Sequence, residues 1–362
     1  ASDHALRRLI GDDGELAALG ASLGSAEIRD AARDAQTRLP ELRSFDRNGR
    51  RIDEVHFHPA YHRLMALGLE AGYAASAWEP GGSHARHAAM MYLFSQIEPG
   101  VCCPMTMTYA AVPALDADPD LAALWQPRLM ARAYDPSRRS VDQKAGATMG
   151  MAMTEKQGGS DVRANSTLAQ RDDSHGGWRL TGHKWFCSAP MCDGFLTLAQ
   201  TERGLSCFLV PRWLPDGTRN AFNILRLKDK LGNKANASSE IEYADTFAHL
   251  LGAEGRGVQT IIEMVHHTRL DTAMAPAGLM RAALSEALHW ARGRTVFQKR
   301  LVDQPLLKGG AVRGVPHGLG QRPAHLQRRA DHAVQPRVLD HADDGRHAPP
   351  LFAQRWEPPW IC

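Results

Sequence analysis

The sequence predicts an α+β fold in which a helical part is followed by a part made of strands and then by helices again. Two changes of hydrophobic period indicate this order. Apolar residues recur at helical spacing up to about residue 148, alternate as in strands from Gly150, and return to helical spacing after Gly257. With 362 residues, the chain is long enough for two or three domains and a sizeable core. Runs of strands that are flanked by runs of helices are typical of α+β proteins.

Residues 1–148 are predicted to form an N-terminal α-helical domain. Pro and Gly interrupt helices, and their clusters at 79–82 and 98–100 separate the helical stretches of this part. The apolar positions at helical spacing are Leu6, Leu9, Ile10, Leu16 and Leu19, then Leu64, Met65, Leu67 and Leu69, then Met90, Met91, Leu93 and Phe94.

Residues 149–255 are predicted to form a middle β domain. The polar stretch DDSHGG at 172–177 has the composition of a turn between two strands. Short strands at such regular spacing indicate a compact all-β unit. The expected strands are 166–171, 178–186, 195–200, 204–212 and 241–249.

Residues 256–307 are predicted to begin a C-terminal helical bundle. The segment 258–274 reads as one amphipathic helix, and 278–294 continues the same pattern. Because proline removes a backbone donor and clashes with the preceding turn, we expect Pro276 to kink or restart the helix.

The last segment, 308–362, loses this regularity. It holds 7 of the 21 prolines in 55 residues, is crowded with Arg and His, and shows no apolar face longer than one turn. Such a tail is typical of a disordered linker, or of coding sequence read in the wrong frame, and we favour the second interpretation. Its histidines fit no helical face or zinc-ligand spacing, so no metal site is expected; they are His317, His325, His332, His341 and His347.

Composition and charge exclude several classes of protein. A hydrophobic content of 43% and a charged content of 23% are ordinary for a globular protein, and no apolar run is long enough to span a membrane. The net charge of +3 comes entirely from the tail, because residues 1–307 carry 35 basic and 35 acidic side chains. Net charge therefore gives no argument for binding nucleic acid.

Cysteine usage and the first residues predict a cytoplasmic protein. The six cysteines show no C-x-x-C spacing, and Cys102 and Cys103 are adjacent, which favours buried free thiols in a reducing compartment. The first twenty residues are charged and helix-like, unlike a signal peptide. The chain starts without Met, which indicates processing or a fragment.

The stretch MAMTEKQGGSDVRANS at 151–166 concentrates hydrogen-bonding groups after a Met-rich strand. The Gly158–Gly159 pair would let backbone approach a ligand closely, and exposed N–H groups and the Ser160 hydroxyl could hold a phosphate oxygen. An ordinary surface turn has the same composition, and most such turns bind nothing. Taken alone, the stretch leaves both readings open.

Three further segments carry chemistry-bearing residues. GHKWFCSA at 182–189 ends a strand with two aromatics and a hydroxyl, and we expect one of Trp185 and Phe186 to pack in the core while the other faces a planar ring. The polar loop at 226–243 opens into a strand. In RTVFQKRL, Arg294 and Phe297 are three apart and are expected on one helix face.

Taken together and in order, these motifs resemble the acyl-CoA dehydrogenase family. The segments are MAMTEKQGGSDV, GHKWFCS, KDKLGNKANASS, GRGVQTIIEM and R-x-x-F. The amino-acid sequences of 98–115 and 204–222 are similar to those of the AidB-like branch, which is linked to the response to DNA alkylation. The resemblance covers about residues 1–307. It implies flavoenzymes that oxidise CH–CH groups, with a helical domain, a β domain and a four-helix bundle.

The resemblance also implies FAD as cofactor. Met153 and Thr154 would bond the pyrimidine side of the flavin, Ser160 would reach the pyrophosphate, Phe186 would lie against the ring and Ser188 would lie near N5. Donors at these places favour the reduced flavin, on which negative charge builds. The residues implied to bind cofactor are Met151, Met153, Thr154, Gly159, Ser160, Phe186, Cys187, Ser188, Arg294 and Phe297.

The same resemblance implies binding partners, and it shows where this sequence differs from the family pattern. Arg294 and Phe297 would contact the FAD of a neighbouring subunit, which implies a homo-oligomer, usually a tetramer, and acyl-CoA is the implied substrate. The family pattern R-x-x-F-G ends here in Gln298, and most of the bundle that carries the usual catalytic base is missing before the tail. The alternative base position holds Thr268, so no catalytic residue is assigned.

Three functions therefore remain open. The first is an FAD-dependent acyl-CoA dehydrogenase-like protein of the AidB type, impaired by loss of the bundle. The second is a DNA-binding factor that protects against alkylation and keeps FAD as a structural group; the best basic cluster for it is Arg281, Arg292, Arg294, Lys299 and Arg300. The third is an inactive, frameshifted product, from which we expect weak FAD retention and no reaction with acyl-CoA.

Overall fold

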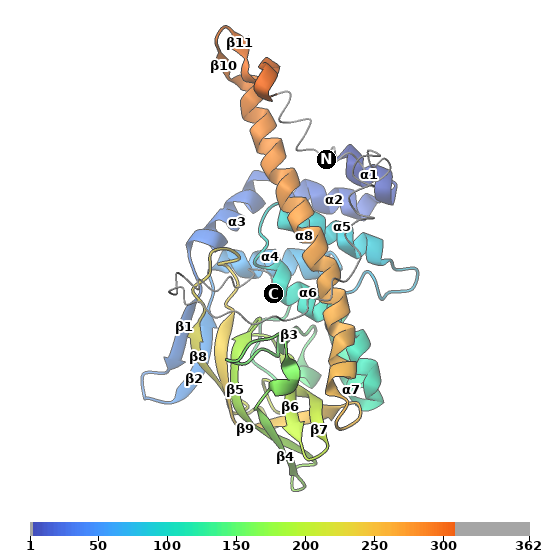
Figure 1. The fold of residues 1–362 in the computed structure, drawn as a ribbon, viewed down its shortest axis with the longest axis vertical. Helices are drawn as coiled ribbons and strands as arrows, with labels where there is room; N and C mark the ends of the chain where they lie inside the picture. The colour runs from blue at the N-terminus through green and yellow to red at the C-terminus, as the bar shows by residue number, and fades with distance from the viewer. Residues whose placement is uncertain (1–2, 308–362) are drawn as a thin grey trace, which may run out of the picture. The chain divides into compact units, whose positions relative to one another are not determined.

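The computed structural model describes residues 3–307, which fall into two compact units, 3–282 and 283–307. In the first unit, helices precede and follow a seven-stranded sheet (Figure 1). The fold class is therefore confirmed as α+β. The predicted tail, 308–362, lies outside the described residues.

The N-terminal part contains seven α-helices and one hairpin within residues 3–129. Most of the helices start at a side chain that accepts hydrogen bonds from the first free N–H groups; Asp13, for example, accepts from Leu16 N at 3.0 Å. The helices are α1 (His4–Ile10), α2 (Gly14–Leu23), α3 (Ala26–Thr37), α4 (Pro59–Glu70), α5 (His84–Ser95), α6 (Cys102–Ala111) and α7 (Pro119–Leu129). The Pro and Gly clusters at 79–82 and 98–100 lie between helices, as expected.

The hairpin of β1 (Glu41–Phe45) and β2 (Arg51–His56) is not predicted by the sequence analysis, which reads 1–148 as helical throughout. β1 has no buried residue, and one of the two buried residues of β2 is the charged Asp53, so the alternation of apolar residues by which a strand is recognised is weak. Only Val55 of β2 joins a core cluster, and this contact fixes the hairpin on the β domain.

The strands of the middle part form a sheet that closes on itself. The order is β3-β6-β4-β5-β9-β7, β6 also pairs with β7, and β8 pairs with β9. The pairs β3–β6 and β4–β6 are parallel, and the others are antiparallel. The strands are β3 (Met149–Ala152), β4 (Leu168–Asp172), β5 (Gly177–Cys187), β6 (Gly194–Thr201), β7 (Gly204–Pro211), β8 (Phe222–Leu227) and β9 (Ser239–Leu251). The five strands expected from periodicity correspond to β4, β5, β6, β7 and β9; β3 is expected only as the Met-rich strand before the 151–166 stretch, and β8 is not predicted.

Both faces of strands β6 and β7 are buried, and they contribute to two separate cores. Alternate side chains of a strand point to opposite faces. Leu196, Leu198 and Leu209 join the core that the helices cover, whereas Phe195 and Phe208 join the core inside the closed sheet. The helical part and the sheet are thus held together by apolar packing along β3, β6 and β7.

Helix α8 runs without interruption from Gly257 to Gly293. Of the two effects expected of Pro276, a kink or a restart of the helix, the restart is wrong: the proline costs one backbone hydrogen bond, and the flanking turns stay helical. In the first unit, Ile261 and Met264 of α8 are buried in the helical core.

A close approach of α8 to α5 generates a test of this packing. A Cβ on Gly278 would lie 2.5 Å from the carbonyl oxygen of Tyr92, whereas a Cβ on Gly20, inside α2, would have its nearest neighbour at 4.0 Å. We expect Gly278→Ala to destabilise the protein by about 1–3 kcal/mol through overpacking. The matched control, Gly20→Ala, should stabilise by up to about 1 kcal/mol through helix propensity. Urea midpoints measure both, and equal effects of the two substitutions would contradict the packing.

Candidate functional site

The structure brings the two flavin-edge segments of the sequence analysis into direct contact. Trp185 N donates to Thr154 O at 2.9 Å, and Ser188 N donates to Met151 O at 3.0 Å. Met151 N in turn donates to the Ser188 hydroxyl at 2.9 Å. The end of β3 and the end of β5 therefore lie side by side, joined by three hydrogen bonds, as the sequence analysis expects.

A buried ion pair fixes the turn that follows β3. Lys184, on β5, is fully buried, and its ammonium donates to Glu155 Oε1 at 2.8 Å and to Leu198 O at 2.7 Å. The other bonds to the Glu155 carboxylate come from Ser166 N (2.7 Å) and its hydroxyl (2.8 Å), and from Thr167 N (3.1 Å) and its hydroxyl (2.6 Å). Five donors thus hold this carboxylate at the base of the turn.

Burial and pairing act in opposite directions on the pKa values of this pair. Burial alone would raise the pKa of Glu155, but the nearby Lys184 ammonium and the hydroxyl and amide donors outweigh it and lower the pKa to about 2. For Lys184, burial lowers the pKa to about 8, although Glu155 partly opposes the shift. At neutral pH the pair is charged on both sides.

Hydroxyl groups without a protein acceptor gather at this edge. The Thr154 and Ser160 hydroxyls make no hydrogen bond to another residue within 3–307, and the Ser188 hydroxyl accepts from Met151 N without donating to any of them. Ser188 is buried, Thr154 half-buried and Ser160 exposed. These groups can donate to carbonyl, ring-nitrogen or phosphate acceptors of a bound molecule.

The glycine pair shapes the turn beside these hydroxyls. Gly158 has φ of +124°, which side chains other than hydrogen rarely permit. A Cβ on Gly159 would lie 2.7 Å from the Thr154 hydroxyl oxygen. Both glycines are therefore required to keep the turn close to Thr154.

The aromatic residues of β5 lie differently from the expectation. Trp185 and Phe186 are both half-buried and neither belongs to a core cluster, so the prediction that one of them packs in the core is wrong. Trp185 is instead covered by cations, with Lys228 Nζ 3.4 Å from its ring centroid and Arg226 5.5 Å away. Phe186 is half-buried and makes no ring contact with another aromatic of the described chain.

The remaining implied residues of this edge are mostly packing residues. Met151 is buried in the helical core and Met153 packs against it, while Cys187 is fully buried inside the closed sheet. Burial raises the pKa of the Cys187 thiol to about 12, so this thiol is inert. Only the backbone groups of these three residues can serve a ligand at the edge.

Arg294 and Phe297 belong to the second unit and do not share a helix face. Helix α8 ends at Gly293, and a tight hairpin of β10 (Thr295–Val296) and β11 (Lys299–Arg300) follows. Phe297 and Gln298 form its turn, with φ of +47° and +60°, and Phe297 is 93% exposed. The expected helix face is wrong because the β-branched pair Thr295 and Val296 favours the extended chain here.

The position of the alternative catalytic base holds no usable carboxylate. The Thr268 hydroxyl donates to Val265 O at 2.9 Å within its own helix, and Glu263 is exposed. One turn further on, Asp271 is buried but already bonded to His87 Nε2 at 2.7 Å, to the Tyr73 hydroxyl at 3.3 Å and to the Thr106 hydroxyl. Sequence analysis missed this buried network, because its members are spread over almost 200 residues.

Neither metal chemistry nor membrane insertion is indicated by residues 3–307. No group of three or more His, Cys, Asp or Glu side chains there is arranged to hold a metal ion. No helix in the described ranges is both long and apolar enough to cross a membrane. The five cysteines of this part are all buried free thiols.

Three family models match successive parts of the chain. Residues 2–136 match the adaptive response protein AidB N-terminal domain, residues 150–246 match the acyl-CoA dehydrogenase middle domain, and residues 255–313 match the acyl-CoA dehydrogenase C-terminal domain.

Individual proteins show the same similarity. AidB of Escherichia coli (strain K12) is 46% identical over 301 residues, which are 82% of this chain and 56% of that protein. Acyl-CoA dehydrogenase family member 11 of Caenorhabditis elegans is 33% identical over 84% of this chain and 52% of its own length. The chain thus spans about half the length of these relatives.

Solved structures agree with the sequence matches. The crystal structure of Caenorhabditis elegans ACDH-11 in complex with C11-CoA has a TM-score of 0.76 at 32% identity, over 86% of this chain and 55% of that one. The apo form of Bd2924 has a TM-score of 0.76 at 31% identity, over 86% of this chain and 65% of that one.

The ion pair below the turn generates a prediction. In Glu155→Gln the buried Lys184 ammonium loses its charged partner, so we expect unfolding to become easier by about 3–5 kcal/mol at pH 7. The double variant Glu155→Gln with Lys184→Met should recover part of this loss, because it leaves no uncompensated charge.

The same pair predicts a pH dependence. Since the folded pKa of Glu155 lies below its ordinary value of 4.5, its stabilising contribution is complete above pH 4.5 and is lost as the pH falls towards 2. The free energy of unfolding of the native chain and of Glu155→Gln should therefore converge over that window. Urea titrations from pH 7 to pH 3 measure this, and a constant difference between the two proteins would contradict the assignment.

Proposed function

This chain belongs to the acyl-CoA dehydrogenase family, with an AidB-type N-terminal domain, and from this premise we propose that it binds FAD at the edge formed by 151–160 and 186–188. The single observation that carries the proposal is a set of three hydroxyls at that edge, on Thr154, Ser160 and Ser188, that donate to no residue of 3–307. The proposed cofactor contacts are those of the sequence analysis.

The chemistry of these groups suits a flavin. The pyrimidine carbonyls, ring nitrogens and pyrophosphate of FAD are hydrogen-bond acceptors, and the edge offers hydroxyl donors whose protons no residue of 3–307 accepts. When bound, FAD supplies an acceptor for a hydride from a C–H bond. The protein's share is to hold the ring between Phe186 and the hydroxyls and to favour negative charge on it.

Substrate, assembly and location are proposed with it. Acyl-CoA is the proposed ligand class, supported by the C11-CoA bound to the Caenorhabditis elegans relative. A homo-oligomer is proposed because Phe297, at 93% exposure, is an aromatic side chain that a neighbouring subunit would cover. The buried free thiols support a reducing, cytoplasmic location.

The cofactor proposal is tested by titrating the purified full chain with FAD. We expect saturable quenching of flavin fluorescence. Thr154→Val should weaken FAD binding about 2- to 10-fold, because it removes one hydrogen bond to the cofactor. Apo stability should stay unchanged, since the Thr154 hydroxyl bonds to no described residue. The matched control is Thr181→Val on the exposed part of β5. Absence of saturable binding, or equal affinities of Thr154→Val and native protein, would refute the site.

Oxidation of acyl-CoA by the FAD-loaded chain is expected to fail. The reaction needs a carboxylate at the substrate α-carbon, a contribution of about 10²–10⁴ in rate. Thr268 is not a carboxylate, and Asp271 is saturated by hydrogen bonds. Anaerobic titration with isovaleryl-CoA should therefore leave the flavin oxidised. Its absorbance near 450 nm (roughly, for a flavin) should stay unchanged. Stoichiometric bleaching would show that a base is present after all.

A further inference from the structure

A second site adjoins the flavin edge, in a cavity of about 270 Å³ inside the first unit. Its walls come from β2, α4, the 134–144 connection, the segments that precede β3 and β6, and the end of β7. Ala189, which lines the cavity, directly follows Ser188 of the flavin edge, but none of the proposed flavin contacts lines the cavity. The volume equals about nine waters at ~30 Å³ each, enough for a single-ring compound.

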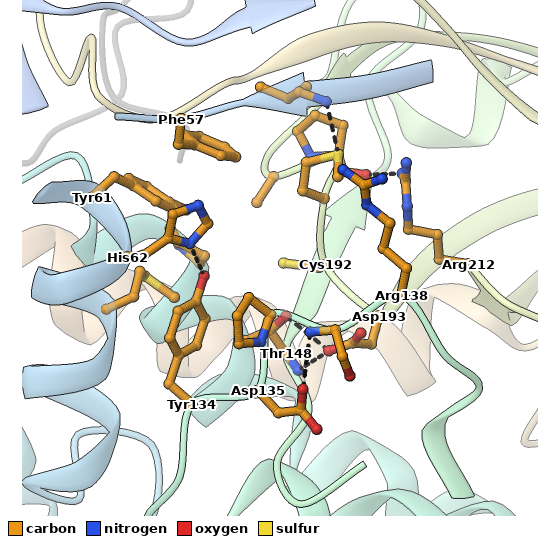
Figure 2. Close-up of a pocket in the computed structure, with 18 of the residues that line it drawn as sticks. Phe57, Tyr61, His62, Tyr134, Asp135, Arg138, Thr148, Cys192, Asp193 and Arg212 are labelled. Carbon is orange, nitrogen blue, oxygen red and sulfur yellow. Dashed lines mark hydrogen bonds between the residues drawn. The ribbon is translucent and has the colours of Figure 1, made fainter. Parts of the chain in front are cut away.

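One end of the cavity is aromatic and uncharged (Figure 2). Phe57 and Tyr61 are stacked with ring centroids 3.9 Å apart, and His62 Nδ1 lies 2.7 Å from the Tyr134 hydroxyl. Burial lowers the pKa of His62 and raises the pKa of Tyr134, so both rings are neutral at pH 7. A flat apolar body would replace water here at little electrostatic cost.

The opposite end carries excess positive charge. Arg212 is buried, and its guanidinium donates to two backbone carbonyls, Asp53 O at 2.8 Å and Pro190 O, with no carboxylate within 4 Å in the described part of the chain. Burial, followed by the neighbouring Arg219, lowers the pKa of Arg212 to about 10, so it remains charged at pH 7. An uncompensated buried cation is costly and favours a bound anion.

The carboxylates near Arg212 are committed to other partners. Asp193 bonds Lys144 Nζ at 2.6 Å and Thr148 N at 2.8 Å. Asp53 bonds Arg51 at 2.8 Å and lies 3.6 Å from Arg219. Both carboxylates oppose the lowering of the Arg212 pKa from a distance, but neither forms an ion pair with its guanidinium within residues 3–307. The cations Arg51, Lys144, Arg212 and Arg219 outnumber these two carboxylates, so a net positive charge remains for a ligand.

Asn236 adds a buried acceptor without a donor. Its Nδ2 donates to Ser188 O at 2.8 Å, and since a carbonyl can only accept, the amide nitrogen must face Ser188. The Oδ1 atom is then left without any hydrogen bond although the residue is only 3% exposed. Such an atom in a cavity wall needs a donor from the molecule that fills the cavity.

We propose that this cavity binds a small aromatic carboxylate that also carries a hydrogen-bond donor, with the carboxylate at Arg212 and the ring against Tyr61, His62 and Tyr134. The three features of the cavity select these three features of the ligand. Figure 2 shows the aromatic residues and the arginines on opposite sides of Cys192. The site is independent of FAD, because it shares no lining residue with the proposed flavin contacts.

The test uses 4-hydroxyphenylacetate as probe and the full chain, by isothermal titration calorimetry. A Kd between about 0.05 and 1 mM is expected for a ligand of this size. The neutral 4-hydroxyphenylacetamide should bind at least about 10-fold more weakly, since it forms no ion pair with Arg212. Arg212→Gln should remove this preference for the acid.

A matched pair at Ser137 keeps the test decisive if Arg212→Gln fails to fold. Ser137 lines the cavity and is half-buried. Ser137→Phe should fill the space and abolish binding, while Ser137→Ala should change the Kd less than about 3-fold. Saturating FAD should leave the Kd of the probe unchanged. No binding at 10 mM probe (about ten times the weakest expected Kd), equal binding of acid and amide, equal binding by the two Ser137 variants, or displacement by FAD would each overturn the proposal.

Discussion

The ion pair between Glu155 and Lys184 is the constraint on which the candidate site depends. It joins the turn after β3 to the middle of β5 in the interior of the protein, where the mutual attraction of the charges must offset their loss of hydration. The additional donors of Ser166 and Thr167 make the carboxylate well satisfied. Because the ion pair fixes the base of the turn, the hydroxyls of the turn need no hydrogen bond to the protein and can stay close to the surface.

The remainder of the first unit consists of two packed cores and of two places that could bind a ligand. Two apolar cores hold the helices and the closed sheet together. The buried methionine and cysteine side chains near the site belong to these cores, so they serve packing and have no catalytic role. The flavin edge and the second cavity each hold polar groups without protein partners in residues 3–307. Asn236 connects these places, because it holds the Ser188 carbonyl and also lines the cavity.

Periodicity predicted most of the fold because most elements bury one clear face. It failed for the β1–β2 hairpin, which buries only Asp53 and Val55, and for the end of α8, where the positive φ angles of Phe297 and Gln298 leave no mark on apolar spacing. The motifs predicted that the segments of Thr154 and Ser188 serve one ligand, and the structure brings these segments together, but the partner of Glu155 was missed. Lys184 follows 29 residues later, and only the pairing of strands brings the two together.

Amide hydrogen exchange of the FAD-free protein tests most directly whether this edge is assembled before any cofactor binds. The amides of Trp185 and Ser188 donate to Thr154 O and Met151 O, whereas Gly159 lies in the turn beyond them. If the ion pair fixes the two segments, the first two amides should exchange at least about a thousandfold more slowly than Gly159, as expected for bonds that open only in larger unfolding events. Exchange of all three at similar rates would show that the edge forms only around its ligand.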